Sequence, residues 1–67
     1  MKEFTVSDEP AFRVRVKTWK CLSPDQLNAI EFIKECKDRN GNVEFATTDK
    51  FFMTNEAIRT LAQGLLA

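Results

Sequence analysis

The sequence predicts a small α+β domain with the order β-β-α-β-α, in which two helices pack on one face of a three-stranded sheet. Residues 12–17 alternate strictly between apolar and basic side chains, a pattern typical of a strand with one buried face. Residues 24–39 and 55–65 instead repeat apolar side chains at helical spacing. The length of 67 residues suits one domain, so residues 1–67 are expected to fold as a single unit.

Two strands near the N-terminus are expected to form a hairpin. Residues 4–6 form a short alternating segment, and residues 7–10 have turn composition, because Pro10 cannot donate a backbone hydrogen bond to a sheet. The strand over residues 12–17 follows, and a third strand is predicted over residues 43–48. The inner face of this sheet is expected to carry Phe12, Val14, Val16, Val43 and Phe45.

A central helix is predicted from Pro24 to Arg39. Ser23 is the expected N-cap, Pro24 suits the first helical position, and Gln26 completes a capping box. Residues 40–41 (Asn-Gly) are expected to end the helix. Its buried stripe would consist of Ala29, Ile30, Ile33 and Cys36.

A second helix is predicted at the end of the chain. Residues 49–50 (Asp-Lys) are expected to turn the chain after the third strand. Thr54 can then cap a helix that runs through about Leu65. Its buried stripe would consist of Ile58, Leu61, Ala62 and Leu65.

The composition argues against catalysis. Ten basic residues balance ten acidic ones, and there is no histidine, so the commonest general base and zinc ligand is missing. Cys21 and Cys36 are expected to be free thiols, because the predicted helix would separate them by roughly 20 Å. The row Glu31, Glu35 and Asp38 is expected to be a solvated helix face. The sequence therefore predicts a protein that is not an enzyme and has neither metal nor other cofactor.

The chain has no feature of a secreted or membrane-spanning protein. No apolar segment typical of a signal peptide follows residues 1–3, and no run approaches the roughly 20 apolar residues of a membrane-spanning helix. Two free cysteines agree with a reducing compartment. A cytoplasmic location without a membrane partner is expected.

The candidate partner-binding site consists of Arg13, Arg15, Lys17 and Trp19. The alternation of the strand places all four on one face, away from the core. Three interpretations fit this pattern: a solvated strand, a surface for a protein partner, in which Trp and Arg often dominate the binding energy, and a surface for single-stranded nucleic acid. The neutral net charge favours a protein over a nucleic acid, because phosphate neutralisation supplies most of the affinity for the latter.

A second candidate interface is the apolar patch Phe51, Phe52 and Met53. Together with Phe32, these side chains exceed what the core of so small a domain readily buries. They would either cap the bottom of the core or form an exposed surface, for which a second copy of the chain is one candidate partner.

The strand over residues 43–48 (Val-Glu-Phe-Ala-Thr-Thr) and the basic-apolar strand that ends near Trp19 resemble the discriminator-of-mRNA-degradation antitoxins of T-even-type bacteriophages. This resemblance implies a small folded inhibitor that blocks a host RNase toxin by direct binding. The expected function is a small non-catalytic protein-binding module, such as a phage-type inhibitor or accessory factor. The alternative is a nucleic-acid-binding module that uses the face with Trp19.

Overall fold

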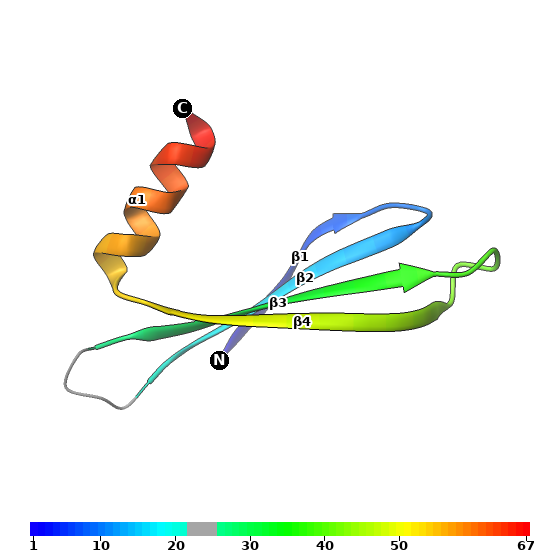
Figure 1. Ribbon diagram of the computed structural model, residues 1–67, viewed down its shortest axis with the longest axis horizontal. Helices are drawn as coiled ribbons and strands as arrows, with labels where there is room; N and C mark the ends of the chain where they lie inside the picture. Colours follow the sequence, from blue (N-terminus) through cyan, green and yellow to red (C-terminus); the bar gives the residue numbers. More distant parts are fainter. Residues whose placement is uncertain (22–25) are drawn as a thin grey trace.

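The computed structural model describes residues 1–21 and 26–67. Within these ranges the chain forms one four-stranded antiparallel sheet followed by one helix, and each strand pairs with its neighbour in sequence (Figure 1). The elements are β1 (Lys2–Asp8), β2 (Phe12–Lys20), β3 (Asn28–Lys37), β4 (Val43–Met53) and α1 (Asn55–Leu66).

The predicted central helix is wrong: most of it is β3, an inner strand that pairs with β2 on one side and β4 on the other. The expected N-cap Ser23 and the expected first helical residue Pro24 lie outside the described residues. Gln26 has a φ of 51° and so is not part of a right-handed helix. The fold is therefore not a three-stranded sheet with two helices.

The reason for this error is that β3 is buried on both faces. Ala29 and Ile33 point to one side of the sheet, while Ile30 points to the other, and all three are buried. Apolar residues on both sides of a strand give no period-two pattern. In β3 they fall by chance at helical spacing.

The expected turn at residues 49–50 is also wrong, since β4 continues through it to Met53. Lys50 lies opposite Glu31 of β3, so the register carries both residues into the sheet. Asn40 and Gly41, predicted to end a helix, instead form the turn between β3 and β4. Gly41 has a φ of 82°, a conformation that a residue without a Cβ adopts at little cost.

Other predictions are confirmed. The N-terminal hairpin forms, and the backbone N–H of Glu9 donates to the carbonyl of Phe12 across its turn (2.8 Å). The third strand over residues 43–48 exists as the first half of β4. The final helix begins where expected, because Thr54 Oγ1 accepts a hydrogen bond from the backbone N–H of Ala57 (3.1 Å).

The sheet has two chemically different faces. On the apolar face, Phe4, Val16 and Phe32 lie in register across β1, β2 and β3. On the charged face, the neighbouring row joins Glu3, Lys17, Glu31 and Lys50 across all four strands.

The helix covers little of the apolar face. Figure 1 shows α1 rising from the end of β4 and standing away from the strands. Among the described residues α1 has no buried side chain, so the predicted stripe with Leu61 and Leu65 is directed toward the sheet but is not buried. The radius of gyration is 14.2 Å, against roughly 11 Å for a compact domain of this length.

Candidate functional site

The predicted partner-binding residues do share one face of β2. Their register partners on β3 are alternate residues, with Arg13 opposite Glu35 and Trp19 opposite Ala29. The structure thus confirms the common face of Arg13, Arg15, Lys17 and Trp19. Their part in binding remains a prediction.

Glu35 on β3 holds the two arginines of this face. Arg13 donates to both of its carboxylate oxygens, from Nε at 2.9 Å and from Nη2 at 3.1 Å, and Arg15 Nε donates to Oε1 at 2.7 Å. The hydrogen bonds from Arg13 first, and from Arg15 next, lower the pKa of Glu35 to about 2 although burial opposes the shift. Glu35 is 7% exposed, whereas its partners Arg13 and Arg15 are half-buried, so the carboxylate is a buried charge paired with two partly exposed cations.

Further ion pairs extend this network to the edge strand β1. Arg15 Nη1 also donates to Glu3, and Lys37 donates to Asp8. The hydrogen bond from Lys37 lowers the pKa of the Asp8 carboxyl. The bonds of Glu35 join β3 to β2, the bond of Glu3 joins β1 to β2, and the bond of Asp8 joins β1 to β3. The ion pairs therefore connect different strands of the sheet.

The charged face is therefore largely self-neutralised. Arg13 and Arg15 are paired, and Lys17 lies in register between Glu3 and Glu31. Cations engaged in this way attract phosphate groups less than free ones do. Of the two partner classes expected for this face, nucleic acid is the one that the pairing disfavours.

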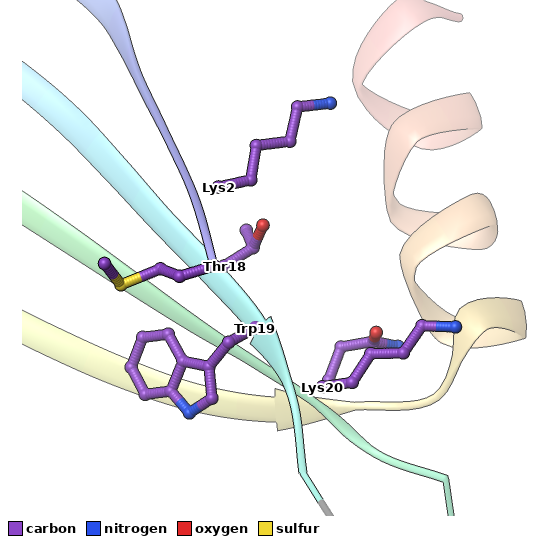
Figure 2. Close-up of a pocket in the computed structure, with 6 residues that line it drawn as sticks. Lys2, Thr18, Trp19 and Lys20 are labelled. Carbon is purple, nitrogen blue, oxygen red and sulfur yellow. The ribbon is translucent and has the colours of Figure 1, made fainter.

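Trp19 lies at the end of the charged face that is nearest α1. Lys50 Nζ lies 5.0 Å from the centroid of its ring, a cation–π contact. Ala29 of β3 lies in register between Trp19 of β2 and Phe52 of β4, and it is fully buried. Figure 2 shows the indole of Trp19 directed to the opposite side of β2 from the Lys20 side chain, at a shallow hollow of about 310 Å³.

A larger groove lies on the apolar face, between the sheet and α1. Its volume is about 420 Å³, and apart from Lys2, Thr18 and Asn28 its lining is apolar. The sheet side includes Phe4, Val16 and Phe32, and the helix side includes Ile58, Leu61 and Leu65.

The predicted interface patch is divided by the structure. Phe51 lies on the apolar face, where its ring packs edge-on against Phe32 with centroids 6.1 Å apart. Phe52 lies on the charged face opposite Ala29, and Met53 is half-buried opposite Asn28. Phe51 and Phe52 are 48% and 57% exposed, so each face presents one of these rings.

Sequence reasoning missed two features of these surfaces. The sequence pattern predicts a solvated helix face for Glu35, but in the structure this residue is the centre of the ion-pair network. A period-two interpretation of residues 28–37 would have placed it with Glu31 on one side of a strand, beside the basic residues of β2. The groove was missed because the helix stripe was expected to be buried against the sheet.

The described residues include no group of three or more cysteine and acidic side chains arranged to hold a metal ion. Cys21 and Cys36 are both free thiols, as predicted. They lie near opposite ends of β3, Cys21 beside Leu27 and Cys36 opposite Phe12, roughly 30 Å apart along the strand. In the part of the chain that is described, no helix is long and apolar enough to cross a membrane.

Comparison with known proteins does not extend this description. No protein-family model, no curated protein and no solved structure matches the chain. The assignment of a function therefore depends on the two faces of the sheet.

Proposed function

We propose that this protein is a small non-catalytic module that associates with protein through the apolar face of its sheet and the facing side of α1. The observation that carries the proposal is the open groove between them. Large apolar side chains on both walls remain in contact with water, and exposed apolar surfaces of this kind mark interaction sites.

The charged face supports the same choice. Its arginines are engaged by Glu35 and Glu3, so it has the character of a solvated outer surface. The earlier candidate site around Trp19 is a secondary contact region in this proposal. The more specific prediction of a phage-type inhibitor of a host protein depends on the sequence resemblance alone.

Chemical cross-linking in native cell extract, followed by mass spectrometry, tests the proposal. Adducts should contain protein peptides joined to β4 or α1, and nuclease treatment should not remove them. Phe51→Asp should abolish these adducts, because it places a charge in the apolar surface. Phe52→Asp is the matched control, since it makes the same change one residue away on the other face and should leave the adducts in place.

Two results would count against the proposal. One is adducts that disappear with nuclease, which would favour nucleic acid as the partner. The other is equal loss with both phenylalanine variants, which would show that the face of the sheet does not matter.

A further inference from the structure

The chain exposes more surface than its mass requires. A compact monomer of 7.7 kDa is expected to expose roughly 4,300 Å², whereas this chain exposes 5359 Å². The surplus of roughly 1,000 Å² slightly exceeds the roughly 800 Å² that one partner contributes to a standard protein interface. The excess exposed area of the monomer is therefore about as large as the area that one partner buries in a standard interface.

Large apolar side chains that line the groove contribute to this exposed surface. Phe4 is 46% exposed, and Leu65 on the helix is 76% exposed. The molecule is also thin, with extents of 45 × 30 × 15 Å. Stable domains bury the apolar side of a sheet under a second layer, and α1 supplies only a small part of one.

The charges indicate what kind of partner completes the layer. The formal net charge is zero, and the arginines of the charged face pair with two acids, Glu3 and Glu35. The groove wall is apolar, so it requires no partner of opposite charge. A patch of this kind can pack against itself around a twofold axis, because the same apolar residues meet from both sides.

The monomer also has little core of its own. Among residues 1–21 and 26–67, the buried apolar residues are Val16, Ala29, Ile30 and Ile33. Oligomerisation is one way in which domains with so small a core gain stability, and a second copy is present wherever the chain is made.

We infer that a second copy of this chain covers the groove, so that the protein is a homodimer whose two sheets face each other with the helices at their flanks. This inference rests on the proposed function, because it names the partner of the same surface.

Sedimentation velocity of the purified protein, from low to high micromolar concentration, tests the inference. The wild-type chain should sediment as a dimer at high concentration, and its melting temperature should rise with concentration. Phe51→Asp should weaken the dimer about 30-fold or more, because its ring packs against the groove residue Phe32 on the same apolar face. Phe52→Asp should change the dissociation constant by less than about threefold, because its side chain lies on the other face.

A second pair of variants distinguishes loss of the dimer interface from unfolding of the monomer. Leu65→Asp alters a groove residue of the helix, and Leu66→Asp alters its neighbour, which does not line the groove. Both residues are far more exposed than buried, so neither change should unfold the monomer. Leu65→Asp should weaken the dimer, and Leu66→Asp should leave it intact.

Three results would overturn the inference. If the wild-type protein stays monomeric at high protein concentration and binds an apolar dye, the dimer inference is wrong. The proposed function would then still stand, because the groove would be open for another protein. A wild-type monomer that binds no dye would overturn both, because the groove would be closed by the chain itself. A dimer that withstands both Phe51→Asp and Leu65→Asp would place the contact elsewhere.

Discussion

The side-chain amide of Asn28 donates a hydrogen bond to Oδ1 of Asn55 over 2.8 Å and so ties the start of β3 to the first residue of α1. The same amide donates to the carbonyl oxygen of Met53 at 3.2 Å. Asn28 is buried, and it spans the short connection through Thr54 that sets the direction of the helix. Asn28, which also lines the groove, thus joins the strand side of the groove to the start of the helix that forms its other side.

Asn28→Ala should destabilise the fold by about 1–3 kcal/mol, because it removes the hydrogen bonds of a buried side chain to Asn55 and to the carbonyl of Met53. Urea denaturation followed by circular dichroism measures the change. Asn55→Asp is the matched control, since its carboxylate can still accept from Asn28 and a negative charge suits a helix N-terminus. Equal loss of stability in both variants would mean that the amide does not hold the helix.

Alanine substitutions of Ile33 and Leu61 should differ sharply in their effect on stability. Ile33→Ala removes a buried side chain of the inner strand and should cost about 2–5 kcal/mol, enough to unfold much of so small a domain. Leu61→Ala should cost less than about 1 kcal/mol in dilute protein, because this side chain is 42% exposed. Thermal melts at low concentration make the comparison, and equal melting temperatures would contradict the open position of α1.

Acid should destabilise the protein through Glu35. The folded pKa of about 2 lies below the ordinary value of 4.5, so the folded state gains stability from the ionised carboxylate above about pH 4.5. This gain is lost as the pH falls from about 4.5 toward 2, and Asp8 contributes in the same direction. The melting temperature should fall steeply as the pH is lowered from about 4.5 toward 2.

The variant Glu35→Gln isolates this effect. It should lower the melting temperature at neutral pH, since Arg13 and Arg15 lose their shared charge partner, and it should flatten the dependence between about pH 4.5 and 2. Glu44→Gln, at an exposed residue of β4, should keep the wild-type profile. An unchanged acid profile in Glu35→Gln would show that other groups control acid unfolding.

Single-stranded RNA and DNA should not bind saturably at physiological salt. The paired arginines of the charged face leave few cations to release counterions from phosphates. Fluorescence anisotropy with labelled oligonucleotides, at low and physiological salt, is the direct measurement. Sub-micromolar binding that weakens steeply with salt, and that Trp19→Ala reduces, would instead favour a nucleic-acid-binding module.

The parts of the fold that the sequence predicted correctly are those set by local chemistry. Thr54 caps α1 through its own hydroxyl, and the alternation of β2 depends on which of its faces is apolar. The shared face of Arg13 and Trp19 follows from the same alternation.

The remaining parts depend on contacts between distant residues. Residues 28–37 have apolar side chains on both sides, and pairing with β2 and β4 decides that they form a strand. Asp49 and Lys50 have turn composition, but Phe32 and Glu31 opposite them keep the chain extended. The role of Glu35 follows only once residues 28–37 are paired with β2 as a strand, because its partners are 20 and 22 residues away in sequence.

The plain up-and-down order of the strands has a kinetic consequence. Because β1 to β4 pair only with their sequence neighbours, the sheet can form as successive hairpins, without the closure of a long loop. Chains with such local topology reach the native state quickly, and a single hairpin forms within about 1–10 μs. Because α1 follows β4 in the chain, the sheet and its apolar surface can form before the helix takes up its position beside them.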